Sequence, residues 1–156
     1  MMKYKLFAGV LCGVFLINVA VDAGVERIDI TERTHYLDGQ SFGETGPYEK
    51  LSGRVYYTVD PAGTLNQTIV DLEGAPRNKA GLVEYSADIL VLVPADRTKV
   101  NGTLIYEVNN RGGSPLLRFE QPSYKLLGRG YTIVLSGWIG ELLPKTERLR
   151  LHAPVA

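Results

Sequence analysis

Gly102-Thr103-Leu104-Ile105-Tyr106-Glu107-Val108-Asn109 and Gly130-Tyr131-Thr132-Ile133-Val134-Leu135-Ser136-Gly137 decide the fold of this chain. Both stretches are almost continuously apolar, which is typical of strands in a sheet that is covered on both faces. About twenty residues connect them, and residues 122–128 within that connection have the length of one or two helical turns, with Gly128 as a C-cap. A strand, a connection with a helix and a second strand predict a βαβ crossover with two parallel strands.

The residues upstream of this unit predict further strands. Residues 83–94 end in an apolar run, and residues 53–60 alternate between polar and apolar side chains before Pro61. Residues 25–31 and 68–72 are predicted as short strands, and residues 37–48 contain the glycines and proline of successive turns. Alternation and tight turns favour antiparallel pairing. We therefore predict an α/β fold with a mixed sheet, in which antiparallel hairpins come first and parallel core strands follow.

The end of the sequence resembles the start of another structural element. Residues 148–156 alternate between polar and apolar side chains and include neither a turn nor a charged tail. We expect the chain to be the front part of a longer protein, with an incomplete sheet.

The beginning of the sequence has the three parts of an export signal. Two lysines precede an apolar run over residues 6–21, and the small residues Val21 and Ala23 occupy the −3 and −1 positions. We predict a cleavable signal peptide over residues 1–23 and a periplasmic or extracellular mature chain over residues 24–156. An uncleaved N-terminal anchor is the alternative, although a membrane span needs about 20 apolar residues.

Signal cleavage would remove Cys12, the only cysteine. The mature chain would then have no disulfide, thiolate metal site or thiol nucleophile. Without Lys3, Lys5 and Asp22, the 17 basic and 17 acidic residues become 15 and 16, a net charge of −1. Because the two signs are interspersed, we expect no nucleic-acid partner and no membrane partner after cleavage.

The two histidines, His35 and His152, show no spacing typical of metal ligands. We therefore predict no metal and no cofactor. His35 lies in a turn-rich stretch and is expected on the surface. His152 belongs to the alternating end of the chain and would precede any plausible catalytic acid.

The segment with the clearest chemical potential follows the strand at residues 102–109. Its loop contains Asn110, Arg111 and Gly112, and a glycine-bearing loop at the carboxyl end of a strand can present backbone N–H groups to an oxyanion. The alternative is a plain strand-to-helix turn, in which Asn and Gly supply positive φ angles. Trp138, at the end of the last apolar stretch, is a candidate for the floor of a substrate pocket near Arg111.

Four blocks of the sequence resemble the N-terminal part of bacterial α/β hydrolase domain-containing proteins. The blocks are GPYEKLSGR at 46–54, APRN at 75–78 with GLVEYSAD at 81–88, EVNNRG at 107–112 and GYTIVLSGW at 130–138. The resemblance covers the whole predicted mature chain. It implies an α/β-hydrolase sheet with the Asn-Arg-Gly loop after the third core strand, in exported proteins several times longer than this chain.

Hydrolases of this fold carry their nucleophile on a Gly-x-Ser-x-Gly elbow between a strand and a helix. Ser114 lacks the final glycine of that pattern, and Ser136 lacks the first one. The resemblance therefore implies that the catalytic serine, acid and histidine lie beyond Ala156. We expect a fragment of a serine hydrolase for small ester-like substrates, inactive by itself. The alternative is an exported binding module that uses Trp138 and Arg111 for recognition.

Overall fold

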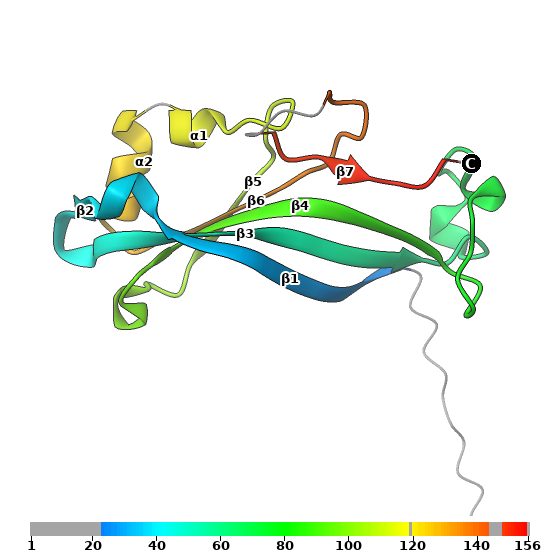
Figure 1. Cartoon of the computed structure of the whole chain (residues 1–156), viewed down its shortest axis with the longest axis horizontal. Helices are drawn as coiled ribbons and strands as arrows, with labels where there is room; N and C mark the ends of the chain where they lie inside the picture. The colour runs from blue at the N-terminus through cyan, green and yellow to red at the C-terminus, as the bar shows by residue number, and fades with distance from the viewer. Residues whose placement is uncertain (1–22, 119, 144–147, 156) are drawn as a thin grey trace, which may run out of the picture.

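The computed structural model describes residues 23–118, 120–143 and 148–155. The predicted signal peptide lies outside the described residues apart from Ala23. In the described part, seven strands form one open mixed sheet in the order β1-β3-β4-β6-β5, with β2 paired to β3 and β7 paired to β4 (Figure 1). The strands are β1 Ala23–His35, β2 Ser41–Phe42, β3 Gly46–Val59, β4 Val83–Pro94, β5 Leu104–Glu107, β6 Thr132–Ser136 and β7 Leu151–His152.

The first half of the chain is antiparallel, as predicted. β3 pairs with β4 without interruption from Tyr48 opposite Pro94 to Val59 opposite Val83. β4 has the predicted bounds, whereas β3 begins seven residues before the predicted strand because its pairing with β4 and β1 continues into the expected turn region. β4 is also antiparallel to β6, so among the described strands only β5 and β6 pair in parallel.

The predicted strand at residues 68–72 is wrong. Residues 60–82 form turns and two short 3₁₀ helices, Thr64–Asn66 and Leu72–Gly74, because β3 and β4 pair directly and leave this connection at their far end. Ile69 and Val70 are 48% and 84% exposed, so their side chains have no sheet to pack on. Leu72 and Ala75 instead close a small apolar cluster with the ends of the two strands.

The crossover after β5 is confirmed. Leu104 to Glu107 pair in parallel with Thr132 to Leu135 of β6. Between them lie two helices, α1 Pro115–Arg118 and α2 Glu120–Leu127. α2 ends as predicted at Gly128, whose N–H donates to the Tyr124 carbonyl at 2.8 Å. β5 is shorter than predicted. Before it, the Asn101 side chain accepts from the Thr103 N–H, and after it the Asn109 side chain accepts from the Gly112 N–H of the following loop.

One face of the sheet carries the main core, and the described residues cover the opposite face only at one end, where Leu72 and Ala75 pack on Val59 and Val83. Figure 1 shows α1, α2 and β7 on the same side of the sheet. The main core lies under α2 and contains Phe42, Tyr48, Leu92, Leu127, Ile133 and Leu135. On the opposite side, exposed apolar side chains project from the two edge strands, including Ile28 and Ile30 on β1 and Leu104 and Tyr106 on β5. Of the two covers that the apolar strands predict, the described residues supply one, and of the second only the part beside Val59 and Val83.

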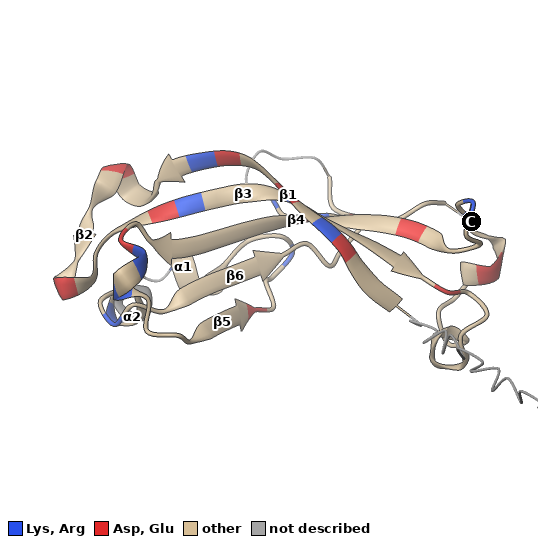
Figure 2. Cartoon of the chain, turned by 90° about the horizontal axis from the view of Figure 1, so that it is seen from below, with Lys and Arg blue, Asp and Glu red and all other residues tan. Residues whose placement is uncertain are grey.

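Charged residues are unevenly distributed over the strands of the sheet. Figure 2 shows basic and acidic residues next to one another along β1 and β3, while β6 carries none. Glu49 of β3 forms two ion pairs, one with Arg33 of β1 and one with Arg97 in the segment after β4. No helix in the described part is long and apolar enough to cross a membrane.

The alternating end of the chain forms β7, as its pattern predicts. Leu151 and His152 pair with Ala87 and Ser86 of β4. The residue before them, Arg150, is bound to β4 through the Asp88 N–H, which donates to the Arg150 carbonyl at 2.9 Å. β7 thereby continues the sheet beyond the end of β6.

Candidate functional site

The loop that follows β5 is a closed four-residue turn. The Asn110 N–H donates to the Gly113 carbonyl at 2.9 Å, and the Gly113 N–H donates back to the Asn110 carbonyl at 3.0 Å. Between them, Arg111 and Gly112 have φ angles of 48° and 79°. Glycine adopts this left-handed conformation freely, whereas it is uncommon for arginine. The two hydrogen bonds hold Arg111 in that conformation at the tip of the loop.

Asn109 anchors this turn to the sheet. Its side chain is buried, with the residue 1% exposed. Its Nδ2 donates to the Ser136 carbonyl at 2.5 Å, and its Oδ1 accepts from the Gly112 N–H at 3.0 Å. Asn109 was not among the predicted site residues, although a polar residue directly after an apolar strand is a signal for such an anchor. The loop is therefore fixed to the end of β6.

Trp138 also holds the loop. Its Nε1 donates to the Asn109 carbonyl at 2.8 Å, and the residue is 52% exposed. The structure thus places Trp138 against Asn109, at the start of the predicted loop. Trp138 contacts the start of the loop and remains partly exposed to solvent.

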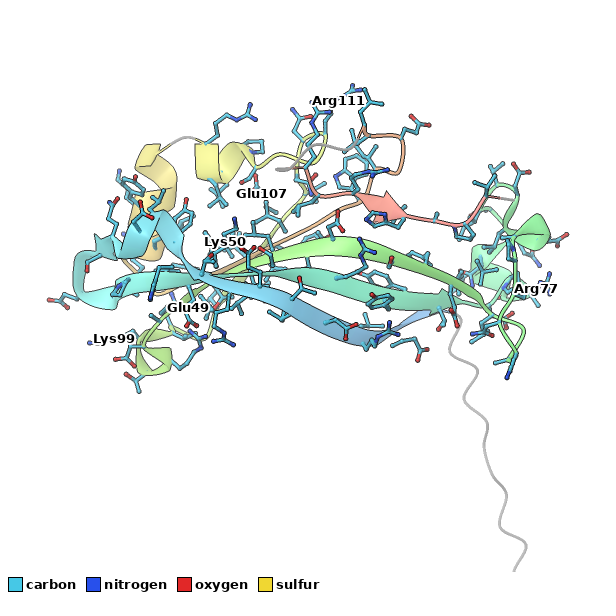
Figure 3. All side chains as sticks on the ribbon, viewed as in Figure 1. Glu49, Lys50, Arg77, Lys99, Glu107 and Arg111 are labelled. Atoms are coloured by element: carbon cyan, nitrogen blue, oxygen red, sulfur yellow. The ribbon has the colours of Figure 1, made fainter. Side chains whose placement is uncertain are left out.

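The backbone N–H groups of the three predicted loop residues differ in availability. Those of Asn110 and Gly112 are used inside the loop. The Arg111 N–H has no acceptor among the described residues. Figure 3 shows the Arg111 side chain on the outer side of the loop, away from the sheet. Of the predicted oxyanion donors, the Arg111 N–H is the one that the turn itself does not use.

Ser114 has a structural partner. Its Oγ donates to Glu107 Oε2 at 2.5 Å and accepts from the Leu117 N–H at 2.9 Å. The same carboxylate accepts from the Leu116 N–H at 2.9 Å. These bonds cap the first N–H groups of α1, which otherwise lack acceptors. Ser114 and Glu107 therefore fix the helix that follows the loop.

Besides the segments around Ser114 and Ser136, one pentapeptide, Gly39-Gln40-Ser41-Phe42-Gly43, does match the nucleophile-elbow pattern, which corrects the expectation that every such serine lies beyond Ala156. The structure places Ser41 in β2, a two-residue strand between two 3₁₀ turns and paired with Pro47. An elbow instead leaves a central strand and enters a helix. Ser41 is exposed, and no described residue accepts from or donates to its hydroxyl.

The two histidines have separate positions. His35 is exposed at the end of β1, as predicted for a surface residue. His152 Nε2 lies 2.9 Å from Asp88 Oδ1 and 3.3 Å from Arg54 Nη2. Ser86 is the cross-strand neighbour of His152, but no hydrogen bond joins a serine hydroxyl to either histidine in the described part of the chain. A serine–histidine pair for nucleophilic catalysis is absent there.

Asp88 is the centre of the contacts that hold β7. Its Oδ2 accepts from the Arg150 N–H at 3.0 Å, and its Oδ1 faces both His152 and Arg54. Burial by itself would raise the pKa of Asp88. The hydrogen bonds from His152 and the Arg150 N–H, with the Arg54 pair, outweigh burial and hold the pKa below its usual value. The carboxylate is thus stabilised in its charged form.

Because the pKa of Asp88 is lowered by folding, its contribution to stability is present above the unfolded-state pKa, about 3.9, and is lost as the pH falls through the folded-state pKa. We expect Asp88→Asn to lower the free energy of unfolding at pH 7 by about 1–3 kcal/mol. The difference from the unmodified chain should shrink below about pH 4. Urea unfolding at both pH values measures it. Asp38→Asn, in an exposed turn, is the control, and an equal loss at both pH values would contradict the assignment.

A groove extends from the loop over the covered face of the sheet. Its volume is about 870 Å³. Gly112, Gly113 and Ser114 line one end, and side chains of β3 and β4 form its floor, including Lys50, Arg54, Asp88 and Leu90. Figure 3 shows Lys50 in the space between the sheet and α1. Trp138 is not among the lining residues, so the predicted pocket floor belongs to other side chains.

No metal centre is evident in the described ranges. No group of three or more His, Cys, Asp or Glu side chains lies close enough there to hold a metal ion. The absence of a metal and of a cofactor stays a prediction. No family model matches the chain, and neither a curated protein nor a solved structure matches it.

Proposed function

We propose that this chain is the N-terminal part of an exported serine hydrolase of the α/β-hydrolase type, which cleaves an ester or a related carbonyl substrate. The observation that carries the proposal is the Arg111 N–H, which has no acceptor among the described residues and lies in a turn fixed by the buried Asn109. In this chain the loop supplies one oxyanion donor, and the catalytic serine lies on residues after Ala156.

The position of the loop in the sheet supports this proposal. Ligands of open α/β sheets bind beyond the carboxyl ends of the strands, and the loop follows β5 at that end. α/β-Hydrolases take one oxyanion donor from the loop between their third strand and the next helix. In this chain the loop likewise lies between a strand, β5, and a helix, α1.

The chemistry would divide between the two parts of the protein. A tetrahedral intermediate places negative charge on the former carbonyl oxygen, and a preorganised N–H stabilises that charge without having to reorient. The second donor in this fold is the N–H of the residue after the nucleophile. Arg111 would thus supply one donor, and the serine elbow would bring the other together with the attacking hydroxyl.

A labelling experiment tests the proposal. The reading frame is sequenced beyond the codon for Ala156, and the complete product is treated with a fluorophosphonate, which reacts with activated serines. We expect labelling at a serine after Ala156 and hydrolysis of p-nitrophenyl esters, with neither in residues 24–156 alone. A stop codon directly after Ala156 would favour the binding module. Labelling at Ser41, Ser114 or Ser136, abolished by its replacement with alanine, would refute this placement of the nucleophile.

A further inference from the structure

The groove beside the loop carries an excess of positive charge. Its cations are Lys50, Arg54, Arg118 and Arg148, and its carboxylates are Glu32 and Asp88. Arg54 is paired with Asp88 at 3.2 Å. Within the described residues, the other three cations form no ion pair. Three basic side chains that have no carboxylate partner among the described residues, gathered in one groove, indicate a site for an anion.

Two of these cations flank the glycines of the loop. A Cβ atom placed on Gly113 would lie 3.3 Å from Arg118 Nη2, and one placed on Gly112 would lie 2.9 Å from the Cβ of Arg148. Arg118 comes from α1, and Arg148 precedes β7. Because the glycines have no side chains, both arginines can approach the loop backbone closely. The loop end of the groove therefore holds the Arg118 guanidinium and the base of the Arg148 side chain.

The rest of the groove is apolar. Leu90 and Leu135 line it from β4 and β6, and Leu117 and Leu149 line it from α1 and from the segment before β7. Their side chains pack on the main core cluster, so this lining is continuous with the interior. A ligand that fits both parts has an apolar body and an anionic group.

We propose that this groove binds an amphipathic carboxylate, with its apolar body on the leucines and its carboxylate between Arg118, Arg148 and Lys50. Guanidinium groups bind carboxylates through two parallel N–H···O bonds, which fixes the orientation of the ligand. The binding of this ligand does not depend on the proposed function, but its role does. If the protein is a hydrolase, the ligand is either an ester substrate that carries a carboxylate or a carboxylate product that remains bound in the groove.

Isothermal titration of the purified chain with 4-phenylbutyrate, and with the neutral 4-phenylbutanamide, tests the binding. We expect the carboxylate to bind at least about tenfold more tightly than the amide, and more weakly as salt increases. Arg118→Gln and Lys50→Gln should each weaken carboxylate binding about three- to tenfold and leave amide binding unchanged. Lys79→Gln, on an exposed turn at the far end of the sheet, is the matched control.

Equal affinity for the acid and the amide, or no binding of either, would overturn the inference. So would charge-removing variants that keep their circular dichroism spectrum and bind the carboxylate as the unmodified chain does. None of these results concerns hydrolysis. Selective carboxylate binding by a complete product that hydrolyses no ester would instead refute the proposed function and leave the anion site intact.

Discussion

Replacing Tyr48 with alanine is expected to lower the free energy of unfolding by about 3–5 kcal/mol, the usual cost of truncating a buried aromatic side chain. Tyr48 is 0% exposed and lies in the main core, where its ring meets that of Phe42 edge-on at 5.7 Å. Its hydroxyl lies 2.9 Å from two carbonyl oxygens, those of Leu127 and Tyr131. One side chain thus joins β3 to the end of α2 and to the segment before β6.

The Tyr48→Phe variant keeps the ring and removes the hydroxyl, so it measures the contribution of the hydroxyl to stability. Burial raises the pKa of Tyr48 to about 12, so the hydroxyl stays protonated and donates throughout the neutral range. Its loss leaves two carbonyls without this donor, at a cost of about 1–3 kcal/mol. Urea unfolding of both variants measures the two contributions. If Tyr48→Phe cost as much as Tyr48→Ala, ring packing would contribute nothing, and the assigned core would be wrong.

Replacing Gly137 with alanine is expected to detach the segment before β7 from the sheet. A Cβ atom on Gly137 would lie 2.2 Å from both the carbonyl carbon and the oxygen of Arg150. Since this backbone cannot rotate away as a side chain can, Arg150 must move and lose the bond from the Asp88 N–H. Overpacking together with a lost hydrogen bond predicts a cost of about 2–4 kcal/mol.

Amide hydrogen exchange can show which part of the chain the Gly137→Ala substitution destabilises. In the Gly137→Ala variant, we expect faster exchange of the Leu149 and Leu151 amides, which donate to Gly112 and Ile139. Gly140→Ala is the matched control, because the nearest atom to its added Cβ would be the Leu151 oxygen at an ordinary 3.6 Å. Equal stability and exchange in both variants would contradict the close approach of Arg150 to the sheet.

The shape of the groove on the covered face of the sheet depends on the same segment before β7. Leu149 lines the groove, and its N–H binds Gly112 of the loop. The Gly137→Ala variant should therefore weaken the binding of 4-phenylbutyrate as well, whereas Gly140→Ala should not. The two experiments connect the stability of β7 to the proposed anion site.

Much of the secondary structure could be predicted because its signals are local. The apolar run of β4, the glycine after α2 and the strand–helix–strand order each depend on residues close in the sequence. The strand predicted at 68–72 failed because β-branched residues favour a strand only where another strand is available to pair with. Propensity alone does not supply that partner.

The candidate loop was predicted, but the roles within it were not. Asn110, Arg111 and Gly112 were equivalent in the sequence, since each has one backbone N–H. Their difference arises because Asn109 and Gly113 accept two of these bonds. The elbow-like pentapeptide around Ser41 shows the converse, since a matching pattern in the wrong structural context does not make an elbow.

The sequence by itself determined an α/β chain with antiparallel strands before a parallel crossover, because apolar periodicity and turn residues act over short distances. Only the tertiary structure decided which face is covered, which loop N–H has no acceptor and which cations share a groove. These properties join distant residues: Asp88 and His152 are 64 positions apart, and Tyr48 and Leu127 are 79 apart. Such contacts follow from strand order and register, which bring together side chains that no local pattern connects.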